Sequence, residues 1–155
     1  MDQPRSPTSA RKSIDTLLDE ARSRWTRLDP LQAHAAMASG ALLIDIRSDG
    51  QRAADGEVPG ALVIARNALE WRCDPTCAAH DPRIDPEQVV IVMCDDGYQS
   101  SLAAATLLQL GLERATDLIG GFQAWRGAGP PVHALTGTSG PSPQTRPLES
   151  RQGGA

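Results

Sequence analysis

The stretch VVIVMCDDGYQSSLAAATLLQLGL, residues 89–112, places a short apolar run, a polar loop and an alanine- and leucine-rich segment in direct succession. A short continuous apolar run is typical of a strand buried on both faces. The segment after the loop has helical composition and a glycine, Gly111, where a helix would end. The stretch therefore predicts a strand and a helix joined by a loop that begins at Cys94.

The rest of the chain shows the same alternation of strands and helices. Further strands are expected at ALLIDIR (41–47), GEVPGALVIAR (56–66) and ATDLIGG (115–121). Further helices are expected at residues 29–40, in a helical turn at NALEW (67–71) and at FQAWRGAG (122–129), with a loop over residues 74–86. Strands that alternate with helices form a mostly parallel sheet covered on both faces. The sequence therefore predicts a three-layer α/β/α fold.

Two segments flank this predicted domain. Residues 1–12 are rich in proline, serine and arginine and are expected to be disordered. From Ser13, apolar residues recur at helical spacing, which predicts an amphipathic helix within an N-terminal extension of residues 1–27. Residues 134–155 lack an apolar period and predict a disordered tail. The domain itself is assigned to residues 28–133.

Composition excludes several classes of protein. A chain of 155 residues with a formal net charge of −4 offers no basic surface for nucleic acid. Its apolar runs are far shorter than the roughly 20 residues of a membrane-spanning helix, and its N-terminus lacks the apolar core of a signal peptide. Three cysteines, an odd number, fit a reducing compartment better than a disulfide framework. We therefore expect a cytoplasmic protein that binds neither nucleic acid nor membranes.

Cys94 is the first candidate for chemistry, because α/β proteins place their sites at the carboxyl ends of parallel strands. The loop from Asp95 to Gln99 must turn sharply at Gly97, so its backbone N–H groups are expected to point inward beside the next helix. Ser100 and Ser101 are expected to cap that helix. Such a cradle binds anions and favours the thiolate. The alternative is that Cys94 is a small apolar side chain packed at a strand end.

Four segments taken together resemble the rhodanese-like domain family over roughly residues 28–133. They are LLIDIR, GEVPGA, VVIVMCDDGYQSSLAAATLLQLGL and DLIGGFQAWRGAGPPV, which occur in the order and at about the spacing of that family. The resemblance implies a five-stranded parallel sheet and a sulfurtransferase. In that family the loop cysteine takes up a sulfane sulfur as a persulfide and hands it to a nucleophile such as a thiol or cyanide. The implied partners are a small-molecule or protein-bound sulfane sulfur donor and a thiol acceptor.

Carried over by position, the resemblance makes Cys94 the nucleophile. The backbone amides of the loop would hold the persulfide and the transferred anion, namely those of Asp95, Asp96, Gly97, Tyr98, Gln99 and Ser100. Asp45 and Arg47 match an Asp-x-Arg motif of the family. We expect this pair to have a mainly structural role, tying a strand end to a loop through charge-assisted hydrogen bonds.

The loop departs from that family in its charge. Members that use thiosulfate often have basic side chains after the cysteine, whereas this loop has Asp95 and Asp96. A carboxylate near the sulfur opposes the thiolate and repels a dianionic donor. Thiosulfate is therefore expected to be a poor donor. Arg66 and Arg72 are candidates to replace the missing charge, and the alternative is that both face solvent.

The sequence gives little support for a metal or a cofactor. Cys73, Cys77 and His80 have zinc-binding side chains, but their spacing is wide for a cysteine pair and no second pair follows. No glycine-rich loop for a phosphate or a dinucleotide is visible. We therefore expect neither a metal nor a cofactor. A separate alternative is that Cys73 or Cys77 resolves an oxidised or persulfidated Cys94.

Two functions remain open at this point. The first is a sulfurtransferase that works through a Cys94 persulfide. The second is a non-catalytic sulfur carrier or protein-interaction module, in which the N-terminal helix docks a partner if it does not pack on the domain. Phosphoryl transfer is disfavoured, because neither Gln99 nor Ser100 supplies the arginine that ends the cysteine loop of related phosphatases.

Overall fold

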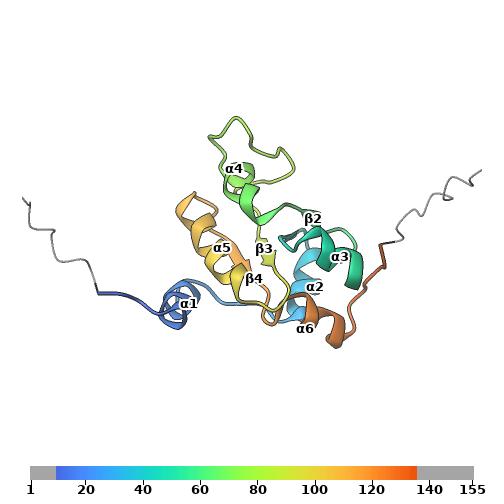
Figure 1. Cartoon of the computed structure of the whole chain (residues 1–155). Coiled ribbons are helices and arrows are strands. Elements are labelled where there is room, and N and C mark those ends of the chain that lie inside the picture. Colours follow the sequence, from blue (N-terminus) through green and yellow to red (C-terminus); the bar gives the residue numbers. More distant parts are fainter. Residues whose placement is uncertain (1–9, 136–155) are drawn as a thin grey trace, which may run out of the picture.

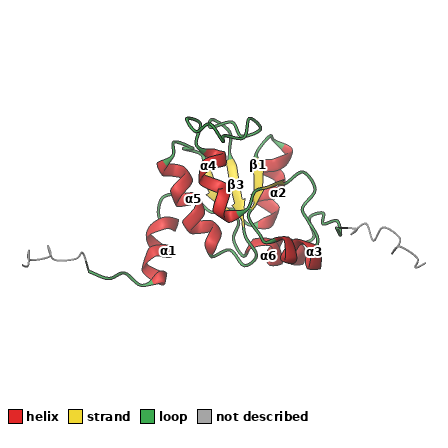
Figure 2. Cartoon of the chain, turned by 45° about the horizontal axis from the view of Figure 1, so that its top comes forward, coloured by secondary structure: helices red, strands yellow, loops and turns green. Residues whose placement is uncertain are grey.

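The computed structural model describes residues 10–135 (Figure 1). Residues 1–9 and 136–155 lie outside the described residues, and with them most of the disordered start and tail that the sequence predicts. In the described part, helices cover both faces of a parallel sheet (Figure 2). The predicted α/β/α architecture is confirmed.

The sheet has four parallel strands in the order β2-β1-β3-β4. The strands are β1 (Leu42–Asp45), β2 (Leu62–Val63), β3 (Val90–Met93) and β4 (Ala115–Asp117). In the centre of the sheet, β1 pairs with β3 so that Asp45 lies beside Met93. Every residue of β3 is buried, with alternate side chains packed into the apolar clusters on the two faces. Burial on both faces explains why this strand has no polar alternation.

The expectation of five strands is wrong for this chain. Next to β4 there is only an isolated parallel bridge between Leu28 and Leu118 among the residues described. In this bridge, the amide of Ile119 donates to the carbonyl oxygen of Leu28 at 2.8 Å. Asp29 follows directly as the N-cap of α2 (Pro30–Ala38), whose first residue is a proline. Because the chain turns into a helix at once, and proline has no N–H to donate, the bridge cannot extend into a strand.

Further helices surround the sheet. They are α1 (Ile14–Arg22), α3 (Asp49–Asp55), α4 (Leu69–Cys73), α5 (Gln99–Gln109) and α6 (Gly121–Ala128), with a 3₁₀ turn η1 (Arg66–Ala68) before α4. One apolar cluster joins the sheet to α4 and α5, and the other joins it to α2 and α6. Within residues 10–135, no helix has the length and apolar character needed to cross a bilayer.

Helix α3 is not predicted by the patterns above, because it is short and polar. Its signal in the sequence is a capping box. Ser48 Oγ accepts a hydrogen bond from the amide of Gln51 at 3.1 Å, and the Gln51 side chain accepts one from the amide of Ser48 at 3.1 Å. This helix follows β1 closely and therefore stands at the carboxyl edge of the sheet.

The N-terminal helix α1 packs against α5 (Figure 1). Leu18 and Ala21 are buried, whereas Ile14 and Leu17 remain exposed. Trp25, just after the helix, packs on the same apolar cluster as α5. The helix assigned to an N-terminal extension is therefore part of the folded body and is not a free docking helix.

Candidate functional site

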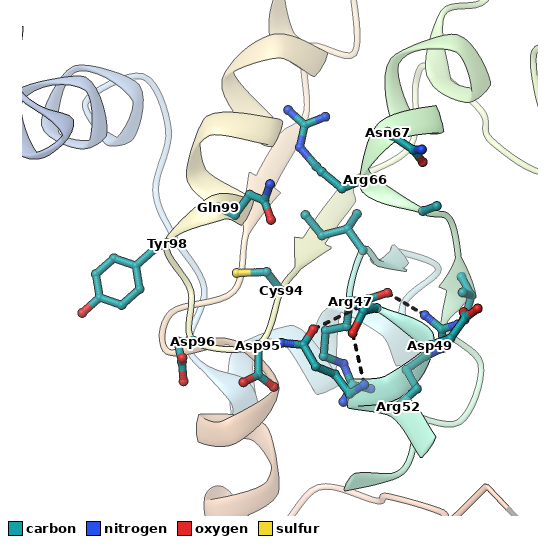
Figure 3. Close-up of a pocket in the computed structure, with 15 residues that line it drawn as sticks. Arg47, Asp49, Arg52, Arg66, Asn67, Cys94, Asp95, Asp96, Tyr98 and Gln99 are labelled. Atoms are coloured by element: carbon teal, nitrogen blue, oxygen red, sulfur yellow. Dashed lines mark hydrogen bonds and ion pairs between the residues drawn. The ribbon is translucent and has the colours of Figure 1, made fainter. Parts of the chain in front are cut away.

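Cys94 lies at the carboxyl end of β3, in the tight loop that leads into α5 (Figure 3). Its Sγ accepts hydrogen bonds from the backbone N–H groups of Gly97 at 3.1 Å and of Ser100 at 3.4 Å. The sulfur thus faces the partial positive charge of two amides beside a helix start, an arrangement that favours anions. Of the six loop amides expected to form a cradle, from Asp95 to Ser100, these two donate to the sulfur.

A pocket of about 600 Å³ opens over Cys94. Its walls are the segment after β1 with the start of α3, the segment after β2, and the cysteine loop (Figure 3). The predicted site residues that line it are Arg47, Arg66, Cys94, Asp95, Asp96, Tyr98 and Gln99. The predicted residues that do not line it are Asp45, Arg72, Gly97 and Ser100. The structure therefore places seven of these eleven residues around one cavity.

The two loop aspartates point away from the sulfur (Figure 3). Asp96 is exposed to solvent. Asp95 Oδ1 accepts a hydrogen bond from Gln123 Nε2 in α6 at 3.0 Å. The same Nε2 donates to Asp55 Oδ2 in α3 at 3.0 Å. Orientation and solvent screening therefore weaken the opposition between these carboxylates and a thiolate.

Two glycines allow α6 to start directly against the cysteine loop. Gly121 has a φ of +62°, and a Cβ at this position would lie 2.5 Å from the carbonyl oxygen of Cys94. The close approach lets the amide of Phe122 donate to that oxygen at 2.9 Å. On the loop side, a Cβ on Gly97, with a φ of +87°, would lie 2.6 Å from the nitrogen of Gly120. Glycine is needed on both sides of this contact, at Gly97 in the loop and at Gly121 in the GGF segment of residues 120–122.

Asp45 and Arg47 form a buried pair below the pocket. Arg47 donates from Nη2 to Asp45 Oδ2 at 2.8 Å and from Nε to Asp45 Oδ1 at 3.1 Å. Its Nη2 also donates to the carbonyl oxygen of Gly56 at 2.8 Å, and its guanidinium lies 3.7 Å from the ring centre of Phe122. The pair links the end of β1 to the end of α3 and to α6, as a structural tie would.

Arg66 and Arg72, the two arginines that follow β2, differ in their position relative to the pocket. Arg66 lines the pocket, and its guanidinium points away from Cys94 (Figure 3). Arg66 Nη1 donates to Glu70 Oε1 at 2.5 Å, so a carboxylate already neutralises its charge. Arg72 is exposed, and its Nη1 donates to the carbonyl oxygen of Ala79 at 3.3 Å. Helix α4 turns Arg72 toward the loop that follows, and Arg72 therefore does not reach the edge of the site.

Asp117, at the end of β4, is a site residue that the sequence reasoning missed. Its buried carboxylate accepts hydrogen bonds from Trp25 Nε1 at 3.0 Å, from Arg27 Nε at 2.9 Å, and from the hydroxyls of Ser100 and Ser101 at 2.8 Å each. The two serines therefore bind Asp117 and do not cap α5, which corrects the expectation above. Burial alone would raise the pKa of Asp117, but the hydrogen bonds from Arg27, Ser101, Ser100 and Trp25 hold it below its usual value.

The N-terminal segment supplies two more groups that the sequence reasoning missed. Arg22 Nη2 and Arg27 Nη2 donate to the carbonyl oxygen of Gly97, at 2.9 Å and 2.8 Å. Arg22 Nε also donates to Ser101 Oγ at 2.8 Å. The visible signal is a charged residue, Asp117, inside a segment predicted as a buried strand, because a buried carboxylate requires donors. That signal does not say which arginines supply them.

The other two cysteines lie outside the pocket lining. Cys73 is buried, and burial, followed by the charges of Glu70 and Asp81, raises its pKa to about 12. Cys77 is partly exposed, and its Sγ accepts a hydrogen bond from the amide of Ala79 at 3.4 Å. Over residues 10–135, no group of three or more His, Cys, Asp or Glu side chains is placed to hold a metal ion.

The match to a known family covers the pocket and the cysteine loop of this site but not Arg22 and Arg27. Residues 29–128 match the family model described as Rhodanese-like domain. This range includes the whole sheet, the cysteine loop and α6. The chain belongs to the rhodanese-like domain family.

Relatives in this family have a stated activity. The Thiosulfate sulfurtransferase GlpE of Stutzerimonas stutzeri (strain A1501) is 36% identical over 102 residues, which cover 66% of this chain and 85% of that protein. The protein of the same name from Pseudomonas aeruginosa (strain LESB58) is 34% identical over 106 residues, which cover 68% of this chain and 88% of that protein. Both similarities span most of the relative's length.

Solved structures with this fold include one of comparable sequence identity. RPA3614 from Rhodopseudomonas palustris CGA009, whose name includes the words "Possible Tyrosine Phosphatase", has a TM-score of 0.73 at 33% identity, covering 83% of this chain and 99% of that one. A rhodanese-related protein from Thermoplasma volcanium has a TM-score of 0.57 at 22% identity, covering 70% of this chain and 98% of that one. The second similarity supports the fold alone.

Proposed function

We propose that this chain is a sulfurtransferase in which Cys94 receives the transferred sulfur as a persulfide. The proposal rests on the position of Cys94 Sγ. This atom lies at a strand end, accepts hydrogen bonds from two backbone amides and adjoins a pocket. Membership of the rhodanese-like domain family supports this class of activity. The names of two relatives, both thiosulfate sulfurtransferases, support it further.

The proposed reaction consists of two displacements at sulfur. In the first, the Cys94 thiolate attacks the outer sulfur of the donor, a new S–S bond forms, and the donor's leaving group departs with the electron pair of the broken bond. In the second, the thiolate or cyanide acceptor attacks the terminal sulfur of the persulfide. The S–S bond to Cys94 breaks, and its electron pair returns to Sγ. Covalent catalysis of this kind divides one difficult transfer into two easier steps.

The loop amides have the role of anion stabilisers in this proposal. The N–H groups of Gly97 and Ser100 already point at Sγ. Addition of one sulfur moves the negative charge outward by one S–S bond, into the space enclosed by the loop. Fixed dipoles aimed at the developing charge stabilise it without reorganising. The loop amides thereby serve both the thiolate and the persulfide.

The charges around the pocket favour a donor of low charge. The arginines that line it are each paired with carboxylates: Arg47 with Asp45, Arg52 with Asp49 and Glu57, and Arg66 with Glu70. Asp95 and Asp96 add further negative charge at the opening. A dianion such as thiosulfate therefore meets little attraction there. We propose a persulfide on a small thiol or on a protein as the donor.

Phosphatase activity, which the name of the Rhodopseudomonas relative raises, is not favoured by this site. Phosphoryl transfer depends on cations that neutralise the equatorial oxygens of the transferred group. The loop from Cys94 to Ser100 contains no arginine. Arg66, on the pocket wall, is paired with Glu70 and points away from Sγ.

The direct test measures the mass of the purified protein after incubation with inorganic and organic sulfane donors. We expect a gain of one sulfur atom in the wild type and none in Cys94→Ser. Subsequent addition of cyanide or a thiol should remove the added sulfur. Absence of any gain with every donor class would contradict the proposal. A gain that no acceptor removes would instead favour the non-catalytic sulfur carrier.

We further propose that the protein works in a reducing compartment, the cytoplasm. Cys73, Cys77 and Cys94 are all free thiols. Cys94 must stay reduced between cycles in order to attack a donor. Fractionation of cells that express the tagged protein would test the location.

A further inference from the structure

The cysteine loop has no basic side chain of its own, yet two arginines lie directly behind it. Arg22 belongs to the last turn of α1, and Arg27 to the segment that follows. The Nη2 atoms of both donate to the carbonyl oxygen of Gly97, at 2.9 Å and 2.8 Å. Two cations therefore converge on one peptide group of the loop.

The same peptide group, which joins Gly97 to Tyr98, directs its N–H into the loop. In a trans peptide the N–H is directed opposite to the C=O. Because the Gly97 oxygen points out toward the arginines, the N–H of Tyr98 points to the inner side of the loop. Charge-assisted hydrogen bonds on the oxygen polarise the peptide and strengthen its N–H as a donor. Positive potential from the arginines thus reaches the inside of the loop through the main chain as well as through space.

We propose that Arg22 and Arg27 are positioning residues that supply the positive potential of the cysteine loop from behind, with Arg22 as the main source because Asp117 is paired with Arg27. The inference rests on the proposed function, because the charge to be stabilised is that of the Cys94 thiolate and its persulfide. Neither arginine lines the pocket, so neither is placed to contact a donor bound there. The two arginines take the role that the sequence suggests for Arg66 and Arg72.

The buried carboxylate of Asp117 orients this arrangement. It accepts from Arg27 Nε at 2.9 Å and from the Ser101 hydroxyl at 2.8 Å, and Arg22 Nε donates to that hydroxyl at 2.8 Å. Asp117 also accepts from the hydroxyl of Ser100, whose backbone amide donates to the sulfur. A single network thus holds both guanidinium groups and one of the amides that bind Sγ.

Arg24 provides a matched control on the same segment. Its side chain is exposed, whereas those of Arg22 and Arg27 are partly buried. Arg22→Gln and Arg24→Gln each remove one positive charge within the same short stretch. The first removes a contact with Gly97, and the second changes a solvated charge that salt screens.

The experiment measures the rate at which iodoacetamide, an uncharged reagent, alkylates Cys94 at pH 7, followed by mass spectrometry of the modified peptide. Arg22→Gln is expected to slow alkylation by about three- to tenfold, because the thiolate loses a nearby partly buried cation. Arg24→Gln should stay within about twofold of the wild type. Equal slowing in both variants, or no slowing in Arg22→Gln, would overturn the inference.

Rescue by charge separates an electrostatic role from a purely structural one. Arg22→Lys retains the positive charge but loses the fork that binds Ser101 and Gly97 together. We expect it to recover most of the alkylation rate. If Arg22→Lys and Arg22→Gln are equally slow, or if Arg22→Gln loses the native near-UV circular dichroism, the contact is structural and the inference is wrong. Arg27→Gln is less suitable, because it also removes a partner of buried Asp117.

Failure of this inference is distinguishable from failure of the proposed function, because alkylation needs no sulfur transfer. If Arg22→Gln slows alkylation while no donor loads the wild type with sulfur, the proposed function fails and the role of Arg22 stands. If the wild type is loaded with sulfur and Arg22→Gln is alkylated at the wild-type rate, only the role of Arg22 fails.

Discussion

Two buried cysteines of this molecule lie in opposite environments. Cys94 Sγ faces the backbone amides of Gly97 and Ser100. Cys73 is fully buried at the end of α4, where burial and then the charges of Glu70 and Asp81 raise its pKa to about 12. A thiol with so high a pKa stays protonated at neutral pH. Burial therefore does not decide whether a thiol is a nucleophile, whereas the direction of the nearest dipoles and charges does.

The largest expected effect comes from removing each thiol in turn. Cys94→Ser should reduce sulfur loading by at least about a thousandfold, because Cys94 is the group that forms the persulfide in the proposed mechanism. Cys73→Ala should leave loading within about twofold of the wild type and lower the free energy of unfolding by about 1–2 kcal/mol, since it creates a small cavity. Intact-mass measurements and urea unfolding follow the two quantities.

An effect of Cys73→Ala on the sulfur chemistry would remove the contrast between the two cysteines. A Cys73→Ala variant that keeps its native fold but holds the loaded sulfur on Cys94 longer than the wild type would indicate that Cys73 takes part in the chemistry. In the resolving role considered above, the Cys73 thiolate attacks Cys94 Sγ of the persulfide, a disulfide forms, and hydrosulfide leaves. Cys77→Ser is the matching control for the partly exposed thiol. It should change neither stability nor loading.

The next effect concerns the close contact that supports the Cys94 loop. Gly121→Ala should lower the free energy of unfolding by about 3 kcal/mol and slow sulfur loading, because a Cβ 2.5 Å from the Cys94 oxygen must displace the loop. Gly127→Ala in the same helix meets no atom within 4 Å. It should be neutral or stabilise by about 0.5–1 kcal/mol. Equal unfolding midpoints for the two variants would show that the loop adapts freely.

A smaller effect, with a defined pH dependence, is expected at Asp117. Asp117→Asn should lower the free energy of unfolding by about 2 kcal/mol at pH 7, because Arg27 loses its charged partner. The pKa of Asp117 is lowered in the folded state, so the ionised carboxylate stabilises the fold above its unfolded pKa, which is about 3.9. This contribution is lost as the pH falls through the folded pKa.

Urea unfolding of the wild type and of Asp117→Asn between pH 8 and pH 3 measures that contribution. The difference between the two proteins should stay constant down to about pH 5 and shrink below about pH 4. A difference that grows on acidification would mean that burial outweighs the hydrogen bonds and that Asp117 is protonated in the folded protein. Cys94 would then lack the charged network behind its loop.

Local patterns in the sequence predict the Cys94 loop but not the residues behind it, Arg22, Arg27 and Asp117. The run from Val89 to Leu112 specifies strand, loop and helix, because each boundary has its own residue signal. Arg27 and Asp117 are separated by 90 residues, and Arg22 and Gly97 by 75. Arginines in an amphipathic helix and a following linker have the same local pattern whether they face solvent or a loop. Only the packing of α1 on α5 brings them to the site.

Two errors in the predicted fold have local causes that the sequence contains. The capping box at Ser48 and Gln51 marks α3 even though the helix has no apolar stripe. The fifth strand ends at one bridge, because Asp29 caps a helix immediately after Leu28. In both places a capping residue is a better guide than hydrophobic periodicity, since the segments are too short for a period to show.

The smallest effect is expected from the loop aspartates, which complete the contrast with Cys73. Substituting Asp95 and Asp96 with asparagine together should speed loading from thiosulfate by only about two- to threefold, because both carboxylates point away from the sulfur and solvent screens Asp96. Loading from the persulfide of a neutral small thiol, which carries at most one negative charge, should change less than loading from thiosulfate and serves as the control. A tenfold or larger gain with thiosulfate alone would show that the carboxylates turn toward the donor as it binds. The environment of Cys94 would then resemble that of Cys73, with carboxylates facing the sulfur, and its activation would depend on the amides and arginines behind the loop.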